Sequence, residues 1–293
     1  MRQAYRRVYD EQMTHHLAHG PGEIPVAGLL LAAGAGRRMG MPKALVRSDD
    51  GVAWVVRGAR LLLASGCSPV VVVVGAHAAE VEAVLAASLD ADARLRVVRA
   101  LDWAEGMSAS LRVGLLALGA VGATERAEAA GSAERADVVA GAGAAEHVEA
   151  AKATGGGEAA GGAEAADRRT PQASGVVITL VDLPDLVAAE IDRVVARALG
   201  EGDRGGHGGG ADDDVAFEGA RGRRALVQAT YQGRPGHPVF VGREHWNALA
   251  DEITGDRGAR AYLEAHGAEL VECGDLGSGA DVDRLLPPSG GTA

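Results

Sequence analysis

Hydrophobic positions along the chain follow two patterns. Short, nearly continuous apolar runs that end at glycine or polar residues are typical of strands buried on both faces of a sheet. Longer segments whose apolar residues recur three and four positions apart are typical of helices. The patterns, together with the alternation of apolar and polar residues over 94–99, predict strands over 26–33, 70–75, 94–99, 176–181, 225–230 and 238–241, and helices over 53–65, 78–88, 107–118 and 187–199.

The order of these elements predicts the fold class. Strands that alternate with helices form a mostly parallel sheet covered by helices on both faces, and about 98% of such crossovers are right-handed. We therefore expect a single α/β, Rossmann-like, doubly wound domain, in which strand 176–181 lies beside strand 26–33. Ligands bind such sheets at the carboxyl ends of strands where the order reverses. The turn at Gly34 and the carboxylate of Asp182 should therefore face each other.

Two segments interrupt the alternation. Residues 119–175 consist mostly of alanine, glycine and glutamate, and residues 200–223 contain a glycine-rich stretch followed by Asp212-Asp213-Asp214. Neither has a sustained apolar stripe, so neither can bury enough surface to offset its ordering entropy. We expect disordered surface insertions within one domain over 26–286, with a flexible extension over 1–25 and a tail over 287–293. The three aspartates are interpreted as a solvated loop.

Charge and composition exclude several classes of function. The 29 lysines and arginines are outnumbered by 40 aspartates and glutamates, and only 3% of residues are aromatic. Binding a nucleic acid requires cations against its phosphates or aromatic rings against its bases, so we expect no nucleic-acid partner. Two cysteines cannot form a disulfide framework. No apolar run is long enough for a membrane span and the N-terminal stretch lacks a signal pattern, so we expect no membrane partner and a cytoplasmic location.

The segment from Leu31 to Lys43 carries the strongest chemical signal. Glycines at the end of a buried strand let the backbone approach a ligand, and exposed amides form an anion site. Arg37, Arg38 and Lys43 add positive charge, which suits the phosphates of a nucleoside triphosphate. The spacing fits neither the P-loop nor the dinucleotide fingerprint, in which a third glycine would stand at Met39.

This segment resembles the Leu-Ala-Ala-Gly-x-Gly/Ser-x-Arg-Met-Gly-x-x-Lys signature of the MobA-like nucleotidyltransferases, and within them most resembles the molybdenum cofactor cytidylyltransferases. Further stretches match at 103–111, at 181–184, and at 236–239 with 255–260. Together the matches extend from Val26 to about Asp283 and leave out the two insertions. The resemblance implies the nucleotide-diphospho-sugar transferase type of fold.

The resemblance also implies roles for individual residues. Arg38 and Lys43 would hold the β- and γ-phosphates and, with Asp182, would form the catalytic set. Asp182 and Asp283 would bind Mg²⁺, and Asp281 remains an alternative because Arg284-Leu285-Leu286 departs from the family's ending. The implied nucleotide-binding residues are Leu31, Ala32, Ala33, Gly34, Gly36, Arg37, Arg38, Lys43, Gly106, Ser108 and Ser110.

Structural roles compete with some of these assignments. Asp182 and Ser108 could be helix N-caps, and Arg37 could be a solvated arginine. Asp256 and Arg257 could line an acceptor pocket or cap the helix that follows. The resemblance puts His237 near the acceptor without a defined role.

The predicted function is transfer of a nucleoside monophosphate, CMP from CTP, to a small phosphorylated acceptor with release of pyrophosphate. The choice of CTP rests on the resemblance at Ala32-Ala33-Gly34 and Pro42-Lys43. The resemblance implies molybdopterin as the acceptor, and a molybdenum hydroxylase or its maturation factor as a protein partner. The alternatives are a guanylyltransferase, a sugar-phosphate nucleotidyltransferase or a non-catalytic nucleotide-binding protein, which Ala100 in place of the usual Asn would suit. An NAD-dependent oxidoreductase ranks last, because residues 75–77 offer no acidic ribose ligand.

Overall fold

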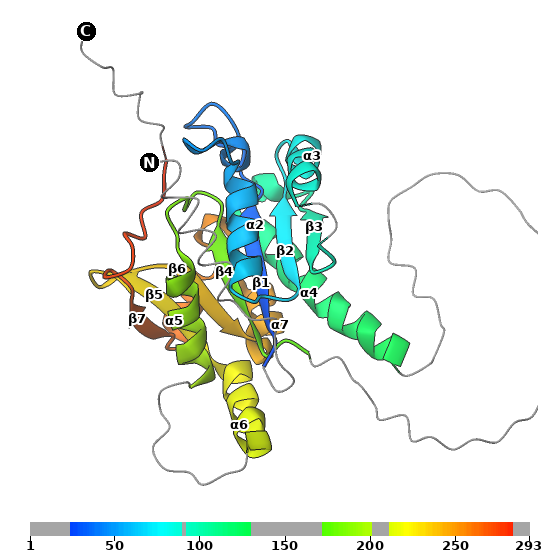
Figure 1. The fold of residues 1–293 in the computed structure, drawn as a ribbon, viewed down its shortest axis with the longest axis vertical. Helices are drawn as coiled ribbons and strands as arrows, with labels where there is room; N and C mark the ends of the chain where they lie inside the picture. Colours follow the sequence, from blue (N-terminus) through cyan, green and yellow to red (C-terminus); the bar gives the residue numbers. More distant parts are fainter. Residues whose placement is uncertain (1–23, 90–91, 130–171, 201–210, 284–293) are drawn as a thin grey trace, which may run out of the picture. The chain divides into compact units, whose positions relative to one another are not determined.

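The computed structural model describes residues 24–89, 92–129, 172–200 and 211–283 (Figure 1). The chain divides into two units. The first, residues 1–120 with 171–293, contains the sheet. Of the second unit, residues 121–170, the structure describes the end of one helix, through Ala129. Among the described residues, no helix is both long enough and apolar enough to cross a membrane.

A seven-stranded sheet forms the centre of the first unit, in the order β3-β2-β1-β4-β6-β5-β7. The strands from β3 to β4 are parallel, β6 is antiparallel to both β4 and β5, and β7 is parallel to β5. The prediction that the fourth strand lies beside the first in a mostly parallel sheet is confirmed. The strands are β1 (Val26–Ala32), β2 (Val70–Val74), β3 (Leu95–Arg99), β4 (Gly175–Leu180), β5 (Leu226–Tyr231), β6 (Arg234–Gly242) and β7 (Glu269–Glu272).

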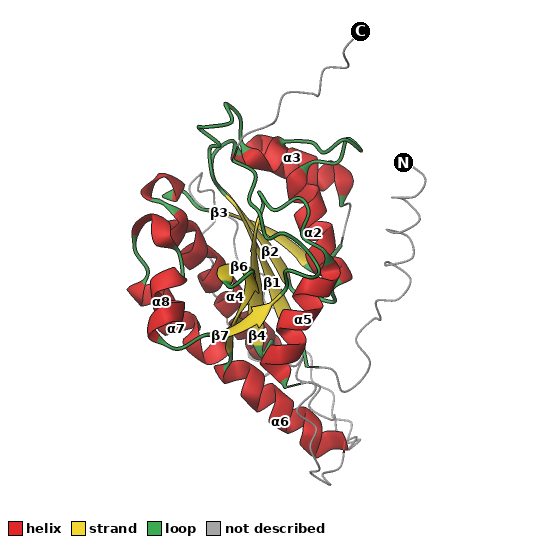
Figure 2. Cartoon of the chain, turned by 90° about the vertical axis from the view of Figure 1, so that its left-hand side faces the viewer, coloured by secondary structure: helices red, strands yellow, loops and turns green. Residues whose placement is uncertain are grey.

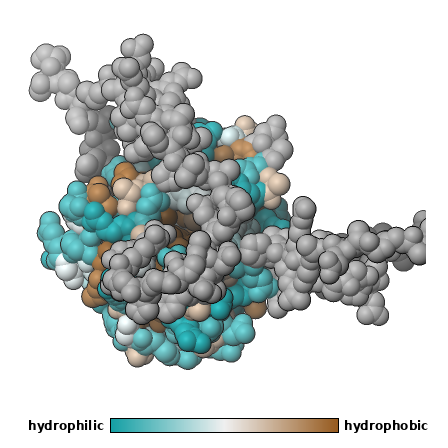
Figure 3. Space-filling model, turned by 60° about the horizontal axis from the view of Figure 1, so that its bottom comes forward, coloured by the Kyte–Doolittle hydropathy of each residue, from teal (hydrophilic) through white to brown (hydrophobic). Residues whose placement is uncertain are grey.

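Helices cover both faces of the sheet (Figure 2). One face carries α2 (Trp54–Ala64), α3 (Ala78–Ser88) and α5 (Ala188–Leu199), and the other carries α4 (Met107–Ala129), α7 (Trp246–Glu252) and α8 (Arg260–Ala265). Strand β1 supplies both cores because its side chains alternate between the faces. Leu30 packs toward α2, whereas Leu29 and Leu31 pack toward α4. On the described surface in Figure 3, hydrophilic residues predominate and apolar ones are scattered.

The carboxyl ends of β1 and β4 meet at one edge of the sheet. The Val181 amide donates to the Leu31 carbonyl over 3.1 Å, and the Ala76 amide donates to the Ala33 carbonyl over 2.9 Å. The turn that follows β1 therefore starts between its two neighbouring strands. This is where the strand order reverses and where a ligand is expected.

The predicted boundaries of both insertions differ from the structure. Helix α4 continues through Ala129, eleven residues beyond the predicted end at 118, and α6 (Ala211–Arg224) occupies the whole second half of segment 200–223. Alanine, glutamate and arginine are strong helix formers, which explains the longer α4. In α6 three aspartates open the sequence and arginines end it, a charge order that favours a helix. The remaining parts, 130–171 and 201–210, lie outside the described residues, as do 1–23 and 284–293.

The turn between β5 and β6 is held by the carboxylate of Glu272. This carboxylate accepts hydrogen bonds from the amides of Gln232 (2.8 Å), Gly233 (3.2 Å) and Gly274 (3.0 Å), and from Oγ1 of Thr230 (2.9 Å). Gln232 and Gly233 both have positive φ values, 54° and 76°. These hydrogen bonds, the one from Gln232 first, lower the pKa of Glu272 below its ordinary value of 4.5.

A lowered pKa in the folded state makes this carboxylate stabilising above about pH 4.5, and the contribution is lost as the pH falls through the folded-state pKa. We expect Glu272→Gln to be less stable than the wild type at pH 7, with a gap that narrows between pH 6 and pH 3. Urea unfolding across this range measures the gap. Glu264→Gln, which removes an exposed glutamate paired with Arg260, is the matched control. A constant Glu272→Gln gap would contradict this role for Glu272.

Candidate active site

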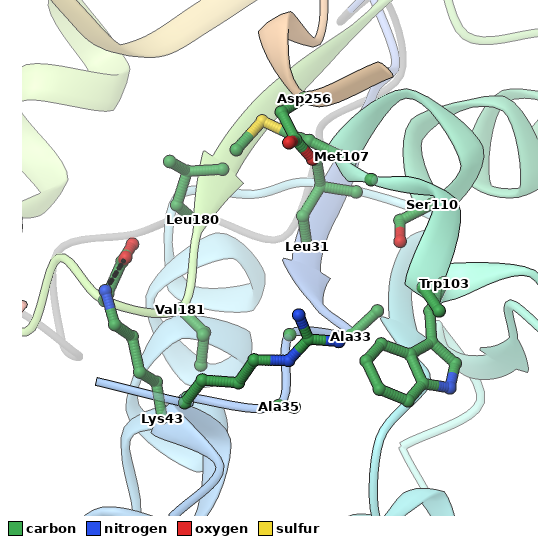
Figure 4. A pocket seen from close by; sticks show the side chains of 16 residues that line it. Leu31, Ala33, Ala35, Lys43, Trp103, Met107, Ser110, Leu180, Val181 and Asp256 are labelled. Atoms are coloured by element: carbon green, nitrogen blue, oxygen red, sulfur yellow. Dashed lines mark hydrogen bonds and ion pairs between the residues drawn. The ribbon is translucent and has the colours of Figure 1, made fainter. Parts of the chain in front are cut away.

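A pocket of about 420 Å³ opens at the carboxyl ends of β1 and β4 (Figure 4). We call it the first pocket. Its walls come from the turn after β1, the segment that leads into α4, and the end of β4. The lining residues are Leu31, Ala33, Gly34, Ala35, Gly36, Arg37, Lys43, Trp103, Ala104, Gly106, Met107, Ser110, Leu180, Val181, Asp182 and Asp256.

The turn after β1 requires glycine at one position. Gly36 has φ of 59°, and a Cβ there would overlap the carbonyl oxygen of Met41. Its own carbonyl accepts a hydrogen bond from the Met39 amide (2.8 Å), which closes the turn. A short 3-10 helix, Lys43–Leu45, follows directly. The compact turn thereby returns the chain to the pocket, where the Lys43 side chain reaches Asp182, just beyond the end of β4.

Lys43 joins the two halves of the predicted site. Its Nζ lies 2.7 Å from Oδ2 of Asp182 and 2.7 Å from Oδ1 of Asp283. Arg38 reaches the same cluster, with Nη1 3.1 Å from Oδ2 of Asp283. The expectation that the turn after β1 and Asp182 face each other is therefore confirmed, although 139 residues separate Lys43 from Asp182 along the chain.

Three carboxylates converge here. One ligand oxygen each from Asp182, Asp281 and Asp283 lies within 4.8 Å of the others. The segment that carries the last two is tied to β4, since the Val282 amide donates to the Asp182 carbonyl over 3.0 Å. The buried Oδ1 of Asp182 has no hydrogen-bond partner among the described residues. Clustered carboxylate oxygens, one of them buried and free, are a donor set that fits a hard divalent cation.

The charges around Lys43 set its protonation. Burial alone would lower the pKa of the Lys43 ammonium, but the hydrogen bonds and charges of Asp182 and Asp283 outweigh burial and raise it. In return, the hydrogen bond from Lys43, with the charges of Lys43 and Arg38, holds the pKa of Asp283 below its usual range. The lysine is thus a fixed cation and Asp283 is an anion at neutral pH.

The opposite end of the first pocket is aromatic. Trp103 lies at the far side from Lys43 (Figure 4). Its side chain packs so closely on Gly75 that a Cβ at Gly75 would lie 2.6 Å from the Cβ of Trp103. Ser110, near the start of α4, points into the pocket close to Trp103 (Figure 4). The first pocket therefore has Lys43 and Asp182 at one end and a flat ring with a hydroxyl at the other.

A second pocket of about 320 Å³ adjoins the first and shares Leu31, Met107 and Asp256 with it. We call it the second pocket. Apolar residues form most of its walls, and His237, Gln228 and Arg257 supply polar groups. Burial lowers the pKa of His237 to about 4, against the opposing effect of Asp182, so the imidazole is neutral at pH 7.

Most of the residues predicted for nucleotide binding line the first pocket, but three do not. Ala32 packs into the core on the α2 side, Ser108 is buried under the start of α4, and Arg38 is 75% exposed beside Asp283. Arg37, for which a solvated arginine was the alternative, does line the first pocket.

Sequence reasoning missed several lining residues. The missed residues in the matched stretches are Trp103, Ala104, Met107 and Val181, of which Trp103 gave the clearest signal through its aromatic ring; Ala35 lies in the glycine turn, and Leu180 offered no signal. Asp256, predicted for an acceptor pocket or a cap, lines both pockets, and Arg257 lines the second. Asp281 joins Asp283 in the carboxylate cluster, so both alternatives lie at the site.

Comparisons with known proteins agree with this architecture. Residues 28–270 match the MobA-like NTP transferase domain. Nicotine blue oxidoreductase of Paenarthrobacter nicotinovorans is 28% identical over 271 residues, covering 91% of this chain and 96% of its own. Rv0371c from Mycobacterium tuberculosis H37Rv has a similar structure, with a TM-score of 0.52 and 19% identity over 89% of this chain and 94% of that one. Its homologue from Mycobacterium sp. strain JC1 gives 0.51 and 21%, over 88% and 90%.

Proposed function

The chain belongs to the MobA-like NTP transferase family, and on that premise we propose that it transfers CMP from CTP to a phosphorylated acceptor and releases pyrophosphate. One observation carries the proposal. The Lys43 ammonium, from the turn after β1, contacts Asp182, from the end of β4, at the charged end of a pocket large enough for a small ligand. A cation for phosphates and a carboxylate for a metal are thereby combined in one site.

The carboxylate cluster suits Mg²⁺, which prefers oxygen ligands and is usually held by one or two carboxylates together with substrate phosphates. Asp182 would bind it through its buried free Oδ1, and Asp283 or Asp281 would provide the second ligand. Bound there, the cation would supply charge neutralisation and orientation for the phosphates.

The protein's own groups would act mainly by positioning and by charge. In this proposal Lys43 leaves its carboxylate contacts in part to stabilise the negative charge that develops on the departing pyrophosphate, and Arg38 adds a second cation. The glycine turn offers backbone amides to the phosphates. An oxygen of the acceptor's own ionised phosphate attacks the α-phosphorus of CTP as pyrophosphate leaves, so the reaction does not require a strong general base.

The polarity of the first pocket orients the nucleotide in this proposal. With the triphosphate at Lys43, the base extends toward Trp103 and Ser110 (Figure 4). An indole ring can stack on a base, and a hydroxyl can hydrogen-bond its edge. The preference for CTP is supported by the resemblance of Ala32-Ala33-Gly34 and Pro42-Lys43 to cytidylyl-transferring enzymes.

The second pocket would receive the acceptor. It is contiguous with the first, mostly apolar, and contains a neutral imidazole, two arginines and an aspartate. These features suit a molecule with a partly apolar body and polar edges, and the resemblance favours molybdopterin. A molybdenum hydroxylase or its maturation factor would then be the protein that receives the product.

A titration panel tests the donor. Isothermal titration calorimetry with CTP, GTP, ATP and UTP in the presence of Mg²⁺ should show tightest binding of CTP, and molybdopterin should then release pyrophosphate from CTP. A clear preference for GTP would instead favour a guanylyltransferase, and preference for another nucleotide with a sugar phosphate would favour a sugar-phosphate nucleotidyltransferase. Tight NTP binding without pyrophosphate release from any acceptor would favour a non-catalytic nucleotide-binding protein.

The name of one relative raises a second candidate. Nicotine blue oxidoreductase is 28% identical to this chain, so an oxidoreductase role for the same pocket is a specific alternative. It predicts that NADH or NADPH binds more tightly than any NTP and is oxidised in the presence of a coloured dye acceptor. Absorbance at 340 nm follows this reaction. The nucleotidyltransferase proposal predicts that the dye causes no oxidation of NADH or NADPH. It also predicts that any binding of these nucleotides is equal in the wild type and in Asp182→Ala.

A further inference from the structure

The last two carboxylates of the cluster lie on a segment without regular structure. Residues 274–283, which we call the carboxylate strap, lead from β7 to Asp283. At its start, the Gly277 amide donates to the Cys273 carbonyl over 3.1 Å, and at its end Val282 bonds to Asp182. A free strap would lose conformational entropy on ordering, and its carboxylates repel each other at the cluster. Near the start of the strap Arg193 also binds Asp275, with Nη2 2.9 Å from Oδ2, so it is the part between Gly277 and Val282 that needs further support.

Two buried polar residues lie under the middle of the strap. Tyr231, at the end of β5, is 7% exposed, and Glu190, in the first turn of α5, is 1% exposed. The Tyr231 hydroxyl lies 2.5 Å from Oε1 of Glu190 and 2.7 Å from the carbonyl oxygen of His237. The other carboxylate oxygen of Glu190 accepts the Val187 amide over 2.8 Å. The hydroxyl thus connects α5, β5 and β6 at one point.

The strap packs directly on this pair through two glycines. A Cβ at Gly279 would overlap the ring of Tyr231, and a Cβ at Gly277 would lie 2.7 Å from Oε1 of Glu190. Gly279 also has φ of 59°, which other residues rarely adopt. Because the contact is this close, the position and direction of the strap depend on where the Tyr231 ring and the Glu190 carboxylate lie. Neither Tyr231 nor Glu190 lines the first pocket, so neither would touch the nucleotide.

We propose that Tyr231 and Glu190 are positioning residues, which hold the carboxylate strap so that Asp281 and Asp283 meet Asp182 around a divalent cation. This inference rests on the proposed function, because it assigns these residues a role in that site. Partners behind the ligands of a metal commonly change metal affinity or activity 10- to 100-fold when they are replaced. The hydroxyl and the carboxylate are suited to this because both are buried and, among the described residues, lie within hydrogen-bond distance of each other and of backbone groups.

Binding of Mn²⁺, measured by the electron paramagnetic resonance signal of the free ion, tests the proposal without turnover. We expect Tyr231→Phe, which removes only the hydroxyl, to bind Mn²⁺ on the order of tenfold more weakly than the wild type. Binding of CTP in EDTA should stay unchanged, because the pair does not line the pocket. The matched control is Tyr262→Phe, which removes another buried tyrosine hydroxyl, bonded to His245 over 2.9 Å, and should leave Mn²⁺ affinity unchanged.

Two substitutions of Glu190 separate positioning from packing. In Glu190→Gln the amide can still donate to the Tyr231 oxygen while its carbonyl accepts the Val187 amide, so Mn²⁺ affinity should stay close to that of the wild type. Glu190→Leu keeps a buried side chain at this position but loses the hydrogen bonds, so Mn²⁺ affinity should fall about as far as in Tyr231→Phe. If Tyr231→Phe fails to fold, Gly279→Ala provides the test from the strap side, because its methyl group forces the strap away from the ring.

The outcomes distinguish this inference from the proposed function. Wild-type Mn²⁺ affinity in both folded Tyr231→Phe and folded Gly279→Ala overturns the inference alone. A wild-type protein that binds Mn²⁺ but releases no pyrophosphate with any NTP and acceptor overturns the proposed function alone. A wild-type protein that does not bind Mn²⁺ overturns both. Weaker Mn²⁺ binding in Tyr231→Phe and Glu190→Leu, with recovery in Glu190→Gln, supports the inference.

Discussion

Replacing Asp182 with alanine is expected to lower the rate of pyrophosphate release from CTP by about a thousandfold or more, equivalent to roughly 4 kcal/mol of transition-state stabilisation. Asp182 is the innermost carboxylate of the cluster, and its buried free oxygen is the best candidate metal ligand in the described part of the chain. A coupled assay for pyrophosphate, with molybdopterin as acceptor, measures the loss.

The same substitution should leave the protein folded. A buried carboxylate oxygen without a partner costs about 1–3 kcal/mol, so removing it offsets much of the stabilisation that is lost with the Lys43–Asp182 ion pair. Lys43 also keeps Asp283 as a partner. We expect the free energy of unfolding in EDTA to change by no more than about 1 kcal/mol. Asp185→Ala, which removes an exposed aspartate from the same loop, is the matched control. Full turnover in Asp182→Ala would contradict the role assigned to this residue.

Lys43→Ala is expected to lower kcat/KM by about 10²- to 10³-fold, the usual effect of removing one group that stabilises developing charge. It should also destabilise the metal-free protein by about 1–3 kcal/mol, between the values for exposed and buried ion pairs. The reason is that Lys43 is only 17% exposed and bridges two carboxylates that would otherwise repel each other. Urea unfolding in EDTA and steady-state kinetics measure the two effects.

Adding a divalent cation provides a further test of the predicted effect of Lys43→Ala on stability. Since Mn²⁺ can neutralise the same carboxylates, it should stabilise folded Lys43→Ala more than it stabilises the wild type, in which the ammonium already occupies the cluster. Arg47→Ala removes an exposed cation close to Lys43 in sequence and should change neither stability nor kinetics. A Lys43→Ala protein with unchanged kinetics, or with equal stabilisation by Mn²⁺, would contradict the account of this lysine.

Much of the fold was predictable because its strands are buried on both faces. Five consecutive valines in β2 can hardly form anything but a central strand, and right-handed crossovers then determine that β4 lies beside β1. Strand β7 was not predicted, because its four residues hold only two adjacent apolar side chains between glutamates, too few to form a recognisable pattern. Helix α6 was not predicted because its sequence, rich in aspartate and glycine, lacks an apolar stripe.

The site was predictable where topology alone determines it. Lys43 and Asp182 could be brought together from the strand order, because both follow strands that are neighbours in the sheet. The places of Arg37, Arg38 and Trp103 depend instead on the conformation of loops, which hydrophobic periodicity does not describe. The support of the strap by Tyr231 and Glu190 was equally hidden, since it depends on contacts between residues 41 or more positions apart.

The affinity for CTP with and without metal tests the central claim most directly, that the turn after β1 and Asp182 share one metal-bound triphosphate. Calorimetry should compare CTP binding in saturating Mg²⁺ and in EDTA, for the wild type and for Asp182→Ala. The account predicts that Mg²⁺ tightens CTP binding at least about tenfold in the wild type and has little effect in the variant, because the coupling passes through this carboxylate. Equal tightening of CTP binding in both proteins would contradict it.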